Sequence, residues 1–232
     1  MKKIYIAIFV STLSVGFAFG QNTGNSDDLE TWTSVRLRYN ASKKWAFELQ
    51  EQLRMKENSS VTDQYFTQLT ARYKLTKNLS LGAGLRYIKR NDTQGKIQGF
   101  EDHFRYHFDL GFKHSLDRFA FNHRLRFQNK NELGVSEEEG DFAKKNFRFK
   151  SSIVYNIRKW KLDPKVSAEI FNKSHEGGTN GFNKYRLTFG TSYNLKKAGE
   201  ISLYYRMEKE LNTFVPKKVN IIGFNYTYAL NN

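Results

Sequence analysis

Hydrophobic and polar residues alternate one by one along most of this chain. In the segment "LSLGAGLRY" (residues 79–87) the apolar side chains share one parity: Leu79, Leu81, Ala83, Leu85 and Tyr87. Serine, glycine and arginine occupy the positions between them. Because the side chains of a β-strand point alternately to its two faces, this segment predicts a strand with one apolar and one polar face.

The same alternation recurs in eleven segments, which predict eleven strands. They span residues 31–40, 45–55, 63–75, 79–89, 101–113, 119–129, 146–157, 160–172, 183–195, 200–209 and 219–230. Short basic turns alternate with longer polar connections rich in Gly or Asn. The segments exceed the ~5–6 residues usual in globular strands and match the ~9–11 that a tilted strand needs to cross a bilayer. This cadence is typical of transmembrane β-barrels.

Strand number follows from a parity rule. Single-chain bacterial barrels have even numbers of antiparallel strands, so a twelfth strand is expected within residues 21–30, although that segment is rich in Asn, Gly and Asp. We therefore predict an all-β fold, an antiparallel up-and-down transmembrane β-barrel of twelve strands. Ten strands, with two segments assigned wrongly, is the alternative.

The N-terminal segment predicts export. Lys2 and Lys3 precede an apolar run over residues 4–19, and Ala18-Phe19-Gly20 forms a small-x-small cleavage site. This pattern indicates a signal peptide over residues 1–20, followed by a barrel domain over residues 21–232. A membrane anchor is the alternative, but the run is short of the ~20 residues that a spanning helix needs.

Composition changes the picture in two ways. The chain has 38 Lys and Arg against 23 Asp and Glu, a net charge of +15, together with 16% aromatic residues. It also has no cysteine, which excludes disulfides, thiol chemistry and zinc–thiolate sites.

The positive charge decides which parity faces the interior. A lipid-facing Arg or Lys at the bilayer midplane would cost ~2–4 kcal/mol, so the polar rows are expected to line the lumen. The basic candidates on these rows are Arg36, Arg38, Arg54, Arg72, Arg86, Arg105, Arg124, Arg126, Arg148, Arg186 and Arg206. Their expected acidic partners are Glu48, Asp109, Glu169 and Glu208.

A family resemblance follows from the hairpins. Residues 32–54, "WTSVRLRYNASKKWAFELQEQLR", and the hairpins after them resemble the uncharacterised outer-membrane β-barrels of domain-of-unknown-function family 2490. The resemblance covers essentially the whole chain after the predicted signal peptide. It implies an outer-membrane barrel, and it supplies no activity and no catalytic residues.

Three interpretations of the basic rows remain open. The charges could be packed into a filled lumen by Arg–carboxylate and Arg–Gln hydrogen bonds, or they could line a narrow pore that favours anions. Basic residues near strand ends could also contact lipopolysaccharide phosphates. The expected partners are outer-membrane lipid and lipopolysaccharide, the barrel-insertion machinery during assembly, and small anions. Nucleic acid is not expected.

Catalysis is the other alternative. His103 and His107 share the inner parity, but ~13 Å of strand separates them. Ser174-His175-Glu176 has the residue types of a hydrolytic triad, although adjacency in sequence is not triad geometry. We expect no catalytic centre, cofactor or metal. A lipid hydrolase and a soluble lipocalin-like binding barrel stay as alternatives.

Two residues conflict with the pattern. Glu51 lies on the apolar parity, where we expect a bulge that reverses the parity or a place above the hydrocarbon. Pro164 falls inside a predicted strand and predicts a bulge or an early break, because proline lacks a ladder donor.

Overall fold

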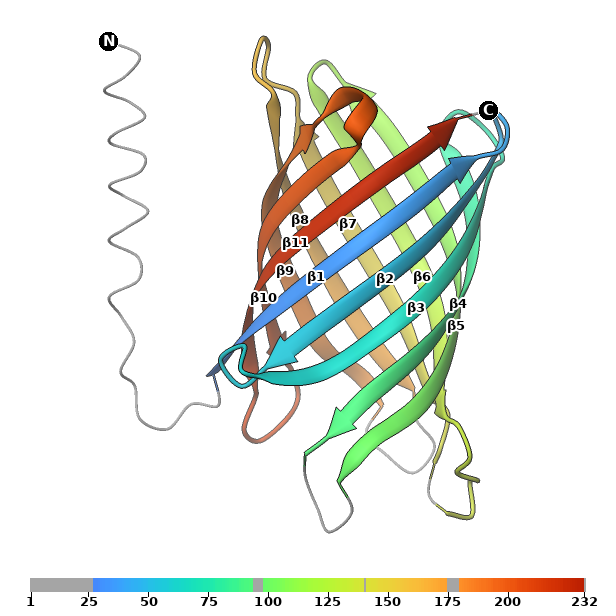
Figure 1. Ribbon diagram of the computed structural model, residues 1–232, viewed down its shortest axis with the longest axis vertical. Coiled ribbons are helices and arrows are strands. Elements are labelled where there is room, and N and C mark those ends of the chain that lie inside the picture. The colour runs from blue at the N-terminus through green and yellow to red at the C-terminus, as the bar shows by residue number, and fades with distance from the viewer. Residues whose placement is uncertain (1–26, 94–97, 140, 175–179, 232) are drawn as a thin grey trace, which may run out of the picture.

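The computed structural model describes residues 27–93, 98–139, 141–174 and 180–231. The predicted signal peptide and residues 21–26 lie outside the described residues. The strands are β1(Asp27–Asn40), β2(Trp45–Lys56), β3(Val61–Lys74), β4(Leu79–Asp92), β5(Gly99–Leu116), β6(Phe119–Glu132), β7(Lys144–Tyr155), β8(Leu162–Ser174), β9(Gly181–Asn194), β10(Glu200–Glu210) and β11(Lys218–Asn231). They close into one barrel in which neighbours in sequence are neighbours in space (Figure 1).

Each of the eleven predicted segments is a strand, so the all-β barrel is confirmed. Most strand ends extend beyond the prediction; the segment predicted over residues 101–113, for example, is β5 over Gly99–Leu116. The one described helix is the 3₁₀ turn η1(Lys196–Ala198). No helix in the described part of the chain is long and apolar enough to cross a membrane.

The predicted number of twelve strands is wrong for the barrel that the described residues form, and so is the alternative of ten. The structure closes with eleven. Because eleven is odd, β1 and β11 run in the same direction and pair in parallel, from Asp27↔Lys218 to Asn40↔Asn231. All other neighbouring strands are antiparallel, as predicted, so the sheet is mixed.

Residues 27–30, the described part of the segment assigned to a twelfth strand, belong to β1. The Asp28 carboxylate accepts hydrogen bonds from the backbone N–H groups of Glu57 and Asn58, at 3.1 and 2.9 Å, in the turn between β2 and β3. The Asp27 carboxylate accepts one from Lys218 Nζ on β11, at 3.0 Å. These contacts on both sides hold residues 27–30 in β1 despite their poor strand composition.

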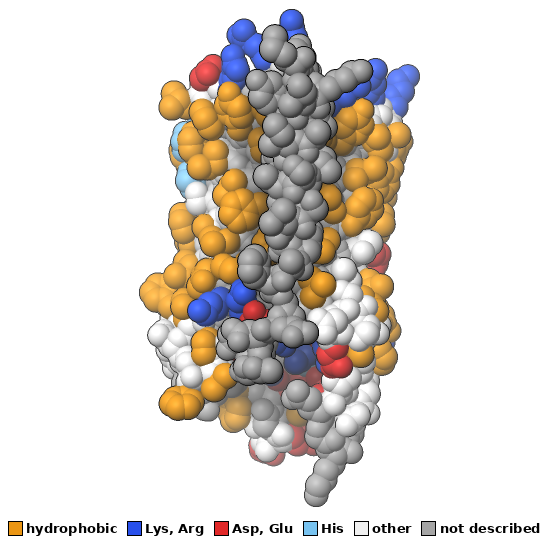
Figure 2. Space-filling model, turned by 90° about the vertical axis from the view of Figure 1, so that its left-hand side faces the viewer, with side chains coloured by type: hydrophobic (Ala, Val, Ile, Leu, Met, Phe, Trp, Pro, Cys, Tyr) orange, Lys and Arg blue, Asp and Glu red, His pale blue; other side chains and the backbone are white. Residues whose placement is uncertain are grey.

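The two faces of the wall differ in the way that decides the parity question. Figure 2 shows hydrophobic side chains over most of the viewed outer surface. On the apolar parity, Leu69 and Phe108 are 58% and 56% exposed, whereas Arg86 and Arg105 on the other parity are 8% and 9% exposed. The apolar rows therefore face outward and the arginine rows face the interior.

Glycines on the inward parity make room for rings. A Cβ on Gly84 would overlap the imidazole of His107 on β5, and a Cβ on Gly223 would overlap the ring of Tyr204 on β10. At Gly84 and Gly223, therefore, a ring packs against the backbone of the wall.

Neither conflicting residue forms the expected bulge. The pairing runs unbroken through Glu51, which lies opposite Val35 and Thr67, so no bulge reverses the parity there. Its carboxylate stays on the outer wall and accepts a hydrogen bond from Thr67 Oγ1 at 3.0 Å. Pro164 causes no bulge, and it pairs with Thr191 of β9 near the start of β8. The pairing of β8 with β7, however, ends at Lys165, so on that side the ladder stops beside the proline, as the missing donor predicts.

Candidate functional site

A cavity of about 380 Å³ lies inside the barrel, and its wall is basic. Thirteen of the side chains that line it are Lys or Arg and two are acidic. The structure places all eleven predicted arginines on this wall: Arg36, Arg38, Arg54, Arg72, Arg86, Arg105, Arg124, Arg126, Arg148, Arg186 and Arg206. Two lysines that the sequence pattern also turns inward, Lys150 and Lys184, complete the set.

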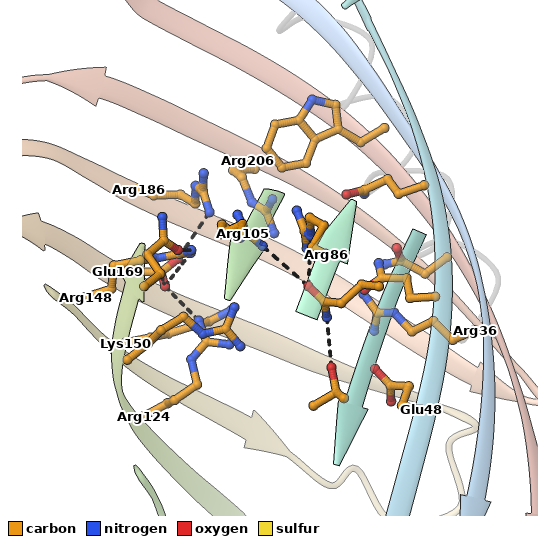
Figure 3. A pocket seen from close by; sticks show the side chains of 18 of the residues that line it. Arg36, Glu48, Arg86, Arg105, Arg124, Arg148, Lys150, Glu169, Arg186 and Arg206 are labelled. Carbon is orange, nitrogen blue, oxygen red and sulfur yellow. Dashed lines mark hydrogen bonds and ion pairs between the residues drawn. The ribbon is translucent and has the colours of Figure 1, made fainter. Parts of the chain in front are cut away.

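One carboxylate on β8 gathers three of these arginines. Glu169, 4% exposed, accepts hydrogen bonds at 2.8 Å from Arg124 Nη2 on β6 and from Arg148 Nη2 on β7. Its other oxygen lies 3.2 Å from Arg186 Nη1 on β9. Figure 3 shows these side chains converging from neighbouring strands. We call Glu169, Arg124, Arg148 and Arg186 the Glu169 cluster.

The other three predicted acids also pair with basic side chains. Arg126 donates from Nε and Nη2 to the two oxygens of Asp109, at 2.6 and 2.7 Å, a bidentate pair. Glu208 accepts from Lys184 Nζ and from Arg186 Nε, and Glu48 accepts from Arg38 Nη2 at 2.8 Å. Charge-assisted bonds of this kind offset the desolvation of the buried groups.

A second group of arginines has an amide in place of a carboxylate. Arg86 and Arg105 face each other across β4 and β5. Both donate to Oε1 of Gln68, from Arg86 Nε at 2.9 Å and from Arg105 Nη2 at 3.4 Å. The Gln68 amide nitrogen donates onward to Thr70. We call Arg86, Arg105 and Gln68 the Gln68 cluster.

Aromatic rings separate the guanidinium groups inside the barrel. The guanidinium carbon of Arg86 lies 3.4 Å from the Phe66 ring centroid, and that of Arg54 lies 3.6 Å from the Trp32 ring. Arg186 lies within 5.5 Å of the Trp32 ring and within 4.9 Å of the Phe171 ring. These distances fit cation–π contacts, which gain strength when water is excluded.

Sequence reasoning did not single out these interior rings. Their signal is parity, because each aromatic residue falls on the row that otherwise carries polar and charged side chains. Trp32, Phe66 and Phe171 are 5%, 1% and 5% exposed, and with Ile88, Val219 and Ile221 they make up the buried apolar side chains of the described residues. The apolar core is thus small and is shared with arginines.

The two inward histidines, His103 and His107, do not form a common site. His103 Nε2 lies 3.1 Å from Glu101 Oε2, whereas His107 Nε2 lies 4.0 Å from Asp109 Oδ2. Ligand atoms of Glu101, His103 and Glu132 lie within 4.8 Å of one another and are the described residues that could hold a divalent cation. The bond between Glu101 and His103 already satisfies one atom of each.

The predicted catalytic alternative is not tested. Ser174 is the last residue of β8, and His175 and Glu176 lie outside the described residues. A hydrolytic role for this segment therefore stays a prediction.

The family of the chain follows from a comparison with known proteins. The model of a family described as protein of unknown function (DUF2490) matches residues 29–213, most of the barrel. The chain belongs to the DUF2490 family. This assignment confirms the resemblance seen in the hairpins. No curated protein matches the chain. Because the family description names no activity, the function of this DUF2490 barrel has to be argued from its two faces.

Proposed function

We propose that this DUF2490 protein is an integral β-barrel of a bacterial outer membrane, with a packed, anion-selective interior in place of a wide pore. The observation that carries the proposal is the reversal of the usual distribution: apolar side chains cover the outside of the barrel, and arginines line the inside. Outer-membrane lipid and lipopolysaccharide would surround it, and the barrel-insertion machinery would assemble it.

The outer wall supports placement in a bilayer. Leu37, Leu49, Leu69 and Leu85 are each 39–58% exposed on the neighbouring strands β1 to β4. Soluble monomers rarely expose contiguous apolar patches larger than a few hundred Å², whereas such a band is what a barrel presents to lipid. The strands, of 11 to 18 residues, are long enough to cross it.

The interior supports a restricted path for solutes. The rings of Trp32 and Phe171, on β1 and β8, approach the same guanidinium group of Arg186, so side chains reach across the lumen. Side chains that are 0–1% exposed, such as Phe66 and Ile221, leave no room for water around them. A lumen lined by one sign of charge concentrates counter-ions, so any ions that pass would be anions.

The location is tested by expressing the full chain in a Gram-negative host. We expect the protein in the outer-membrane fraction, resistant to extraction by urea and alkaline carbonate, and released by detergent as a band whose gel mobility changes on boiling. Recovery of a monomer from the periplasm without detergent would reject the proposal and favour the soluble lipocalin-like barrel.

The interior is tested in planar bilayers. We expect small conductance steps that favour chloride over potassium, with selectivity reduced by Arg36→Glu, which reverses a cavity-lining charge. Lys197→Glu, an exposed residue of a short turn, makes the same change in net charge outside the cavity and serves as the control. Equal effects of both variants would contradict an interior path. Silence of all preparations would leave the barrel as a packed, structural protein.

A lipid hydrolase is the second candidate, and it makes a separate prediction. Fatty acid would be released from phospholipid by the purified barrel and lost in Ser174→Ala. Release that persists in that variant would remove this candidate.

A further inference from the structure

Arg86 and Arg105 are buried cations that pair with no carboxylate of the described residues. They are 8% and 9% exposed, and they lie opposite each other on β4 and β5. Within the described part of the chain, no carboxylate lies at ion-pair distance from either, and their shared partner is the neutral Oε1 of Gln68. Two like charges therefore face each other across a pair of neighbouring strands, held by one amide oxygen.

Unused hydrogen-bond donors point to the same cavity. Nε of Arg105 and Nε of Arg36 are buried and have no partner among the described residues. A buried donor that is left unsatisfied costs about 1–3 kcal/mol, and more when it is charged. In Figure 3, Arg36 and Arg86 lie on the side of the pocket away from Glu169, and Arg105 lies between Arg86 and the Glu169 cluster. These donors are available to a ligand in the cavity.

The excess of positive charge in the cavity indicates an anionic ligand, because water carries no charge. Even with Asp109 and Glu208 counted beside the two acids of the lining, thirteen cations face four carboxylates. Buried charges are stable when they are paired and hydrogen-bonded. Single halide ions can supply charge, but they cannot supply several oxygen acceptors at fixed positions for planar guanidinium forks.

We propose that this cavity binds a small, water-soluble molecule that carries phosphate groups, held by Arg86 and Arg105 of the Gln68 cluster and by Arg36. Phosphate oxygens match the donor geometry of arginine and accept from several guanidinium groups at once. A volume of about 380 Å³ falls within the ~300–1,000 Å³ of small-molecule sites. The inference deepens the proposed function and rests on it, since it names the solute for the anion-selective interior.

The test is calorimetric titration of the folded full-length barrel, in detergent micelles, with pyrophosphate at constant ionic strength. We expect saturable binding of one pyrophosphate, weakened roughly 10- to 100-fold by Arg105→Gln and by Arg86→Gln, because each removes charged hydrogen bonds. The matched control is the double change Arg38→Gln with Glu48→Gln, which removes an ion pair from the same cavity wall without changing the net charge. It should keep the affinity within about threefold of wild type.

Several outcomes would overturn the site. They are an absence of saturable binding, unchanged affinity in Arg105→Gln and Arg86→Gln, or an equal loss in the control, which would indicate unspecific attraction to a basic lumen. Arg105→Lys keeps the charge without the planar fork and is the fallback should Arg105→Gln not fold. An intermediate affinity is expected from it, and wild-type affinity would contradict the assigned geometry.

Phosphate groups also occur on lipid headgroups, so the source is tested separately. Titrations in nanodiscs of zwitterionic lipid and in nanodiscs that contain lipopolysaccharide should give the same affinity for pyrophosphate. A loss confined to the lipopolysaccharide discs would show that a lipid phosphate occupies the site, which would overturn the proposal of a soluble ligand. If the barrel is extracted from the membrane and does not bind pyrophosphate, the phosphate site is rejected and the proposed membrane location stands. If the barrel is soluble and binds pyrophosphate, the membrane location is rejected and the phosphate site stands.

Discussion

The Glu169 cluster and the Gln68 cluster contain arginines that are equally buried but have different hydrogen-bond partners. Arg148 and Arg105 are 8% and 9% exposed, and both lie on the wall of one cavity. Arg148 donates to Glu169 at 2.8 Å, whereas Arg105 reaches the amide oxygen of Gln68 at 3.4 Å. Glu169 supplies the first group with a shared anion, although Nε of Arg124 has no partner among the described residues. The second group has only a neutral amide oxygen, which leaves it able to accept an anion.

The difference teaches that burial alone does not assign a role to an arginine. In the Glu169 cluster, the guanidinium groups of β6, β7 and β9 donate hydrogen bonds to a carboxylate on β8 and so link these strands. In the Gln68 cluster the same groups repel each other and gain from a ligand. The first cluster should therefore respond to mutation in stability, and the second in binding.

The largest effect is expected from Glu169→Gln. The change leaves three arginines without their shared anion, and breaking a buried ion pair costs about 3–5 kcal/mol. The free energy of unfolding, measured by urea titration of the barrel in detergent micelles, should fall by that amount. Glu51→Gln, on the outer wall, is the control and should have a much smaller effect. A loss below about 1 kcal/mol for Glu169→Gln, which is the size typical of exposed pairs, would mean that solvent screens the cluster.

Substituting the two matched arginines should change stability in opposite directions. Arg148→Gln removes charged hydrogen bonds and should lower the free energy of unfolding by about 1.5–3 kcal/mol. Arg105→Gln relieves repulsion from Arg86 in the ligand-free barrel, so that free energy should be unchanged or raised. The same urea titration, in chloride buffer without phosphate, measures both. Equal losses in the two variants would erase the distinction between the clusters.

An intermediate effect is expected at Phe66, whose ring contacts the guanidinium groups of Arg86 and Arg54 at 3.4 and 5.4 Å. Phe66→Leu keeps an apolar side chain but removes the cation–π contacts, worth ~0.5–2 kcal/mol. We expect a loss of that size in thermal or urea unfolding. Phe108→Leu, on the outer wall and 56% exposed, is the matched control. A loss as large in the control would assign the effect to ring size alone.

The smallest effect is expected where a pair reaches solvent. The side chains of Arg38 and Glu48 are 37% and 15% exposed and lie 2.8 Å apart. Removing both charges, by Arg38→Gln with Glu48→Gln, should change the free energy of unfolding by less than about 1 kcal/mol. A change as large as that of Glu169→Gln would indicate that the partly exposed pair of Arg38 and Glu48 stabilises the barrel as much as the buried Glu169 cluster does.

Local sequence patterns predicted the strands and both faces. The alternation at residues 79–87 predicts an amphipathic strand because a strand has a side-chain period of two, and β4(Leu79–Asp92) has it. The arginines could be assigned to the interior because exposure to lipid would be costly at each position. The same alternation predicted four acids on the inward rows as partners of the arginines. Each of them pairs with an inward basic side chain in the structure.

Two further features depend on contacts between segments that are far apart in the sequence. The closure by parallel pairing of β1 and β11 joins residues about 190 positions apart, such as Ser34 and Asn225, whose side chains lie 2.5 Å from each other. The division of arginines between Glu169 and Gln68 depends on which strands are neighbours and on their register. No period along the chain encodes either feature.

By itself, then, the sequence determined an amphipathic all-β chain, the positions of its strands and the side that carries the charge. These properties follow from one strand and its nearest turn, where periodicity and the cost of exposing charge act locally. Tertiary structure alone decided the eleven-strand closure, the rings that separate the guanidinium groups, and the pair of arginines left without a carboxylate. Those features depend on distances across the barrel, which exist only once the sheet has closed.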